Sequence, residues 1–208
     1  MSDMRELSPE ERNRIEAAVT AAETRTSAEF AVAVARASDE YALFPLLWAA
    51  LLALVTGGGI AIAAPMTSVG MSFTLQAGAF IAAGLLLNLG FLRSRLAPPA
   101  LQREYANRLA KLQFASLVNE RTSSDVGLLL FVSLAERHVE ILVDNGIKER
   151  IPQAAFQNII DGFIRDVHQG RIAEGFIAAI EACTLVLQQR FPARPGEPDE
   201  IANRVTEI

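Results

Sequence analysis

Oxygen-bearing side chains stand beside three predicted strands of this chain. Glu29 opens the first strand, Asp125 precedes the second, and Asp144 and Asn145 follow the third. If the first two strands run parallel and the third returns antiparallel, these residues meet at one end of the sheet. Carboxylate and amide oxygens from several loops are the ligands that Ca2+ and Mg2+ take. The sequence therefore predicts a divalent-cation site here. The alternative is that these side chains are solvated or cap turns.

Other catalytic signatures are weak. His138 begins a strand beside a turn, and His168 ends a helix, where a cation complements the helix dipole. Ser123 and Ser124 precede a strand without the evident base partner that a serine nucleophile needs. The sequence has no Gly-rich phosphate loop, no zinc-type Cys/His set and no His-Glu-x-x-His motif. These residues leave open whether the chain is an enzyme.

Composition narrows the classes of partner. The formal net charge is −5 and no run of Lys or Arg is present, which argues against nucleic acid. The single cysteine, Cys183, cannot form an internal disulfide and is predicted to be a small core residue. Met1–Arg14 is charged and lacks an apolar stretch, so we expect no cleaved signal peptide.

Two apolar runs, residues 41–64 and 73–92, contain no Asp, Glu, Lys, Arg or His. Each is long enough to cross the roughly 30 Å hydrocarbon core of a membrane as a helix. A helix satisfies its own backbone hydrogen bonds, which lipid cannot do for it. The short linker Pro65–Ser72 leaves room only for an antiparallel return. We therefore expect a two-helix transmembrane hairpin over residues 41–92, which anchors the protein.

Small residues recur in both spans and are expected to let the two helices pack closely. They are Ala49, Ala53, Gly57, Gly58 and Gly59 in the first span, and Gly78, Ala82, Ala83 and Gly84 in the second. Gln76 and Asn88 are the strongly polar side chains of the second span. We expect them to form interhelical hydrogen bonds or to lie at the membrane interface.

The flanking charges predict the orientation of the hairpin. The linker carries no charge, whereas arginines flank the other side: Arg36, Arg93, Arg95, Arg103 and Arg108. Positive charge is retained on the cytoplasmic side of a membrane. We therefore expect a two-pass protein of the cell inner (plasma) membrane with its soluble part in the cytoplasm.

The polar remainder of the chain alternates helices and strands. Ser8–Glu11 has the residues of a capping box and starts a helix that ends near Thr24. In the strand Glu29–Ala35, large residues alternate with alanines, which predicts one face of large side chains and one of small ones. After the hairpin, the apolar face of an amphipathic helix is marked by Leu101, Tyr105, Leu109 and Leu112.

The second half of the soluble part begins with Val126–Val132, an unbroken apolar run that is typical of a strand buried on both faces. Residues 139–143 alternate as a strand paired to it by a turn, and Asp144–Gly146 has turn residues. Two helices follow, one opened by Pro152 and one over residues 172–187. The first has a strongly apolar face: Phe156, Ile159, Ile160, Phe163, Ile164 and Val167.

The order of elements predicts an α/β fold. A strand, a helix and a second strand form a crossover, which favours parallel pairing, and the turn makes the third strand antiparallel to the second. We expect a small mixed sheet of three or more strands, covered by helices, with the transmembrane hairpin inserted. Residues 1–40 and 93–192 should form the soluble domain, and residues 193–208 a flexible tail without periodicity.

Several short segments of the sequence, taken in order, resemble the TPM domain over about Leu7–Pro192 with the hairpin set aside. They are Thr26–Phe30, Arg121–Leu128, Ser133–Glu140 and Asp144–Ile147. The arrangement is similar to the bacterial membrane branch of the family, in which a hairpin follows the first strand. The resemblance implies an α/β sandwich and, for some members, divalent-cation binding and weak acid phosphatase activity.

We therefore expect a membrane-anchored TPM-like module at the bacterial inner membrane that binds a protein or a divalent cation, Ca2+ or Mg2+, without catalysing a reaction. Two alternatives stay open. One is a metal-dependent acid phosphatase that uses the acidic sheet end. The other is an accessory subunit whose hairpin packs against other membrane helices. The expected partners are the lipid bilayer and either a membrane protein or a second copy of the chain, and not nucleic acid.

Overall fold

The structure is a computed structural model of the chain, and it describes residues 7–38, 41, 43–89, 96–119, 126–193, 201 and 203–208. The chain divides into two compact units. The first unit is formed by Met1–Ser38 and Arg103–Ile208, and the second by Asp39–Gln102. Each unit is considered by itself below.

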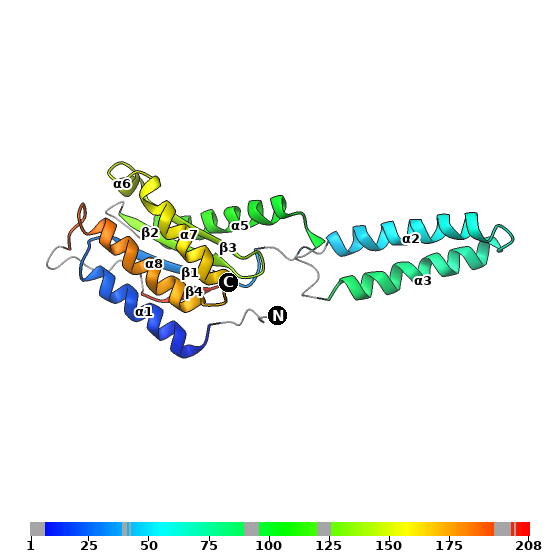
Figure 1. The fold of residues 1–208 in the computed structure, drawn as a ribbon, viewed down its shortest axis with the longest axis horizontal. Coiled ribbons are helices and arrows are strands. Elements are labelled where there is room, and N and C mark those ends of the chain that lie inside the picture. Colours follow the sequence, from blue (N-terminus) through cyan, green and yellow to red (C-terminus); the bar gives the residue numbers. More distant parts are fainter. Residues whose placement is uncertain are drawn as a thin grey trace. The chain divides into compact units, whose positions relative to one another are not determined.

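The first unit is built on a four-stranded mixed sheet in the order β3-β2-β1-β4 (Figure 1). The strands are β1 (Glu29–Ala35), β2 (Gly127–Ser133), β3 (His138–Val143) and β4 (Val205–Glu207). β1 pairs in parallel with both β2 and β4, and β2 pairs antiparallel with β3. The predicted α/β fold, the parallel first pair and the antiparallel second pair are confirmed.

Helices cover both faces of this sheet. They are α1 (Pro9–Glu23), α5 (Pro99–Phe114) with the π-helical turn η1 (Ala115–Asn119), the short α6 (Asn145–Lys148), α7 (Ala154–His168) and α8 (Ile172–Leu187). The start of α1 is the predicted capping box, because Ser8 Oγ accepts the backbone N–H of Glu11 and the Glu11 carboxylate accepts the backbone N–H of Ser8. The local sequence therefore contains the contacts that set this helix boundary.

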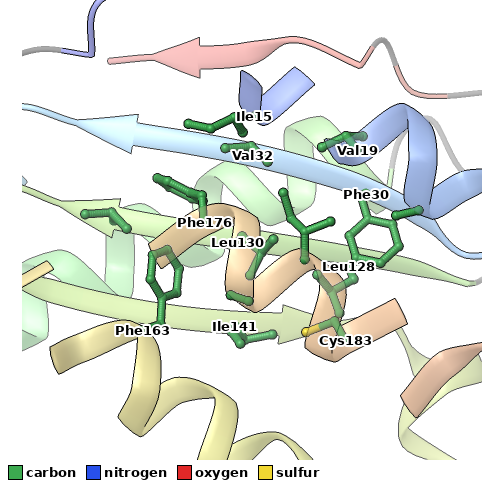
Figure 2. Packing of buried hydrophobic residues seen from close by; sticks show 14 of the residues in the cluster. Ile15, Val19, Phe30, Val32, Leu128, Leu130, Ile141, Phe163, Phe176 and Cys183 are labelled. Carbon is green, nitrogen blue, oxygen red and sulfur yellow. The ribbon is translucent and has the colours of Figure 1, made fainter. Parts of the chain in front are cut away.

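The two faces of β1 enter two separate cores, as the alternation of large and small residues predicted. Phe30, Val32 and Val34 belong to the larger core, together with residues of α1, α7 and α8. Figure 2 shows part of this core between the strands and the helices. The alanines of β1 belong to a smaller core on the opposite face, together with Ala110 of α5. Every residue of β2 is buried, which confirms the prediction of a strand covered on both faces.

The predicted apolar face of α5 is only partly correct, since Leu101, Tyr105 and Leu109 are partly buried and Leu109 packs against the smaller core. The buried residues of this helix are Ala106 and Ala110, whereas Leu112 is exposed. The reason lies in β1, the strand that α5 covers. Its alanines are short, so a helix must come close to this face of the sheet to make contact. The small side chains of Ala106 and Ala110 allow that close approach, while Leu109 packs beside them and Leu112 stays exposed.

α7 and α8 approach each other closely in the larger core. The rings of Phe163 from α7 and Phe176 from α8 meet edge to face with 4.8 Å between their centroids (Figure 2). A Cβ added to Gly175 of α8 would lie 2.9 Å from Cδ2 of Phe163, which is closer than packed carbon atoms allow. The absence of a side chain at Gly175 therefore makes room for the Phe163 ring.

The prediction of a tail without structure is wrong for the last residues of the sequence. Val205–Glu207 form β4, which pairs with the free edge of β1. Ile208 continues the contact, since its N–H donates to Val34 O at 3.0 Å and its carbonyl accepts the N–H of Arg36 at 3.0 Å. Three strand residues give no usable periodicity, so the pairing is decided by the tertiary edge that β1 offers and not by the local sequence.

The second unit contains the helices α2 (Leu43–Ala63) and α3 (Val69–Leu87), which pack against each other (Figure 1). Ala49 and Ala53 of α2 are buried, and a Cβ added to Gly57 would lie 2.8 Å from Oε1 of Gln76 on α3. These contacts confirm that small residues pack the helix pair and that Gln76 lies between the helices. The other glycines predicted to do so, Gly58, Gly59, Gly78 and Gly84, would meet nothing within 4 Å if they gained a Cβ.

Candidate functional site

The acidic sheet end is assembled by backbone pairing. Glu29 stands opposite Gly127 in the parallel pair, and its N–H donates to Val126 O at 3.0 Å. The N–H of Asp144 donates to Gly127 O at 2.8 Å. Glu29 and Asp144 therefore both adjoin the start of β2 from opposite sides, at the sheet end where the sequence placed them. Asp125 lies outside the described residues.

Both carboxylates have structural contacts within the fold. Asp144 is 6% exposed and caps α6, where its Oδ1 accepts the backbone N–H of Asn145 at 2.7 Å. Oε2 of Glu29 accepts the backbone N–H of Ile201 at 3.2 Å. Asn145 is the first residue of α6 and is exposed. The turn expected at residues 144–146 is thus the start of a short helix, and Asp144 satisfies one of its free backbone donors.

A complete metal centre is not formed by the described part of the chain, in which no three His, Cys, Asp or Glu side chains come together as possible ligands. Glu29 and Asp144 supply two carboxylates to one sheet end, and a Ca2+ ion takes six to eight oxygens. Any cation bound here needs further oxygens from residue 125, Asn145, backbone carbonyls or water.

A second polar cluster, formed by Ser38, Ser133 and Glu136, lies at the opposite end of β1 and β2. Ser38 Oγ donates to Ser133 Oγ at 2.8 Å, and Ser133 Oγ donates in turn to Oε2 of Glu136. The backbone N–H of Ser38 donates to Oε1 of the same carboxylate at 3.0 Å. This cluster is not predicted from the sequence, because Ser38 and Ser133 are far apart in the chain. The one local signal was the Ser-x-x-Glu spacing of residues 133–136.

The arrangement of this cluster superficially matches a nucleophile with a general base. Ser133 is fully buried, however, so its hydroxyl cannot reach a substrate. The cluster instead joins the β2–β3 turn to the end of β1, where Leu134 N–H also donates to Ala35 O at 2.9 Å. We interpret the cluster as structural, because its hydrogen bonds hold Ser38, which follows β1, against the end of β2.

The two histidines and the cysteine that the sequence analysis considered have structural positions in the fold. His138 Nε2 is 3.3 Å from Oε2 of Glu140 on the same strand, and His168 is the last residue of α7. Cys183 is fully buried in the larger core, and burial raises the pKa of its thiol to about 12. Its burial in the larger core confirms the prediction that Cys183 is a core residue. Ser123 and Ser124 lie outside the described residues.

The surface of the helix pair α2–α3 is the other distinctive feature. Both helices are long and apolar enough to cross a membrane, and only 11% and 0% of their most apolar stretches are buried. The large exposed side chains of α2 include Leu46, Leu47, Trp48, Leu51, Leu52, Leu54 and Val55. Soluble proteins rarely expose a contiguous apolar surface of this kind.

Comparison with known proteins gives two similarities. Residues 94–186 match the family model of the TPM domain. The fold is similar to the NMR structure of the BA42 protein from the psychrophilic bacterium Bizionia argentinensis, with a TM-score of 0.61 and 18% identity over 100% of each chain. A search of curated proteins finds no match. The matched residues include β2, β3, α7 and most of α8, and β1 joins this region by pairing with β2.

Proposed function

We propose that this chain, whose residues 94–186 form a TPM domain, is a membrane-anchored binding module of the bacterial inner membrane that catalyses no reaction itself. The observation that carries the proposal is the unburied apolar surface of α2 and α3. A core helix of a soluble protein passes the same tests of length and composition, but it would be mostly buried. Lipid covers such a surface, and both helices satisfy their backbone hydrogen bonds internally.

The orientation proposed for the hairpin follows from charge. No charged residue lies between Leu43 and Leu89, and arginines flank the hairpin on the side of the TPM domain. Because Lys and Arg are retained on the cytoplasmic side, the domain should face the cytoplasm and the linker between α2 and α3 the opposite side.

Thiol labelling in intact cells tests the anchor and its orientation together. Met66 is 99% exposed in the linker, and Glu149 is exposed in the TPM domain. We expect Met66→Cys to react with a membrane-impermeant maleimide in intact cells, and Glu149→Cys to react only after the membrane is permeabilised. Native Cys183 supplies no background, since it is buried. Labelling of Glu149→Cys alone would reverse the orientation, and labelling of neither or both in intact cells would contradict a spanning hairpin.

The binding role is proposed because the described residues offer no catalytic pair with access to a substrate. The Glu136 carboxylate accepts hydrogen bonds from Ser133 Oγ, which is closed to solvent, and from Ser38 Oγ, which is partly buried and donates to the same carboxylate at 3.3 Å. Binding of a protein partner requires only the folded TPM domain and the apolar hairpin as its membrane anchor. An accessory subunit of a membrane complex is a form of the same proposal, in which the apolar surface of the hairpin contacts other membrane helices.

Divalent-cation binding is the second candidate function, and the position of Glu29 and Asp144 on either side of the start of β2 favours it. A cation held by both carboxylates would relieve their mutual repulsion and stabilise the folded domain by mass action. We expect millimolar Ca2+ or Mg2+ to raise the melting temperature of the purified protein, measured as the temperature at which Cys183 becomes reactive to a thiol reagent.

Asp144→Asn separates cation binding from folding. Asparagine keeps the N-cap of α6 while it removes the charge, so the domain should fold and lose most of the cation-dependent shift. Asp161→Asn is the matched control, because Asp161 is an exposed carboxylate on α7 and its loss should leave the shift intact. No shift in the parent protein, or equal loss in both variants, would remove this candidate. Phosphatase assays of the same samples, with and without the metal, test the enzyme alternative.

A further inference from the structure

Three cationic side chains lie on the exposed side of α5. Arg103, Arg108 and Lys111 are all exposed, whereas Ala106 and Ala110 on the other side of the helix are buried. Because 3.6 residues complete one turn, the three cations fall within less than half of the circumference of the helix. They are called the basic face of α5 below.

Several arginines elsewhere in this unit are paired with carboxylates. The pairs are Arg12 with Glu207, Arg14 with Glu174, Arg25 with Glu181, and Arg171 with Asp166. Within the described part of the chain, the basic face of α5 forms no ion pair. The whole chain has a formal net charge of −5, so this face is a local excess of positive charge on an acidic protein.

The surroundings of the basic face include a further cation, one acid and one exposed leucine. Lys148 of α6 is exposed, and its Nζ lies 6.0 Å from the centroid of the Phe114 ring at the end of α5. Glu104 is the single acidic residue of α5. Leu112, next to Lys111, is 59% exposed. A leucine beside unpaired cations suits a membrane surface, where the apolar side chain reaches the acyl boundary and the cations meet the head groups.

The position of α5 in the chain keeps this face near the membrane. α5 begins at Pro99, twelve residues after α3 ends at Leu87. Covalent geometry limits that separation to about 42 Å, so the basic face meets lipid at a high effective concentration. Each basic residue close to an anionic membrane surface strengthens attachment roughly fivefold. A few exposed cations are therefore sufficient for a tethered domain.

We propose that the basic face of α5 binds the anionic lipid head groups of the membrane that holds the hairpin. The inference rests on the proposed function, because it needs the hairpin to lie in a membrane. Phosphate oxygens of the lipids would accept charge-assisted hydrogen bonds from the guanidinium and ammonium groups. This contact turns the side of the sheet that α5 covers toward the membrane. The side covered by α1, α7 and α8 is then left for a protein partner.

Fluorescence quenching on the full-length chain tests the contact. Ala115 is exposed one turn beyond Lys111, and Ala115→Cys provides the labelling site, since native Cys183 is buried. The protein is reconstituted into phosphatidylcholine vesicles with or without phosphatidylglycerol, and a membrane-impermeant dye maleimide then labels only the outward-facing domains. We expect the acrylamide quenching constant to be roughly twofold lower with phosphatidylglycerol, and high salt should remove the difference.

A second label position and three substitutions provide the controls. A label at Leu185→Cys, on the exposed side of α8, should be quenched equally in both kinds of vesicle, because α8 covers the opposite face of the sheet. Arg108→Gln combined with Lys111→Gln should remove the difference at residue 115, whereas Glu104→Gln should enlarge it. All three substituted residues are exposed, so these changes should leave the fold intact.

Equal quenching in the two kinds of vesicle would overturn the inference. A difference that survives the loss of Arg108 and Lys111, or that appears equally at Leu185, would overturn it as well. Flotation of the vesicles separates these failures from failure of the anchor. Protein that floats with neither kind of vesicle would overturn the anchor and this inference together. Protein that floats but is quenched equally would overturn this inference alone, and would favour an acidic protein surface as the ligand of the basic face.

Discussion

Phe163→Ala is expected to destabilise the first unit by about 3–5 kcal/mol, the usual cost of emptying the site of a buried phenylalanine. Phe163 is buried, meets the Phe176 ring edge to face, and lies against the backbone of α8 where Gly175 has no side chain. Neither helix can close the void by a small shift, because both also pack on the sheet. A loss of this size is a large share of the stability of an ordinary domain.

Cys183 provides the measurement. It is the single cysteine of the chain, it is buried in the same core, and its thiol has a pKa of about 12 in the folded state. Unfolding exposes the thiol and returns its pKa toward the ordinary value of about 8.5, so labelling at pH 8 reports unfolding of this domain. The single tryptophan, Trp48, lies in α2 and reports on the other unit.

The midpoint temperature of Cys183 labelling should fall by roughly 10 °C in Phe163→Ala, at about 2–4 °C for each kcal/mol in a domain of this size. Leu185→Ala is the matched control, because Leu185 is an exposed residue of α8 and its truncation should change the midpoint by no more than a degree or two. Equal midpoints for the parent and Phe163→Ala would mean that this face of α7 does not pack into the core.

The parts of the fold that the sequence predicted are those in which local pattern and tertiary environment agree. Phe30, Val32 and Val34 alternate with alanines, and the two faces of β1 enter two separate cores. The capping box at Ser8 and Glu11 fixes a boundary through contacts three residues apart. In both cases the information needed for the structure lies within a few residues of the chain.

The parts that could not be predicted depend on partners distant in sequence. The buried face of α5 follows from the alanines of β1, and β4 exists because β1 has a free edge. The cluster at Ser133 depends on Ser38, which no spacing rule connects to it. At the candidate site, strand direction was enough to bring Glu29 and Asp144 to one sheet end. The roles of Asp144 as a helix cap and of Glu29 as an acceptor for Ile201 require the folded structure.

Leu54→Arg should prevent stable insertion of the hairpin if lipid surrounds it. Leu54 lies near the middle of α2 and is 64% exposed, so its side chain faces the surroundings of the helix pair and not α3. An arginine near the centre of a membrane span costs about 2.5–3.5 kcal/mol on the insertion scale, in addition to the loss of the leucine. On the surface of a water-soluble helix the same change costs little and increases solubility. The two environments therefore predict opposite results.

The measurement is the fraction of protein that stays with the membrane after an alkaline carbonate wash. We expect the parent chain to remain in the membrane fraction and Leu54→Arg to be strongly depleted from it, through release, aggregation or degradation. Leu112→Arg is the matched control, because Leu112 is 59% exposed on α5, outside both candidate spans, and its substitution should leave membrane recovery unchanged. A parent chain recovered in the soluble fraction, or a Leu54→Arg variant that is as membrane-bound as Leu112→Arg, would contradict insertion of α2 into lipid.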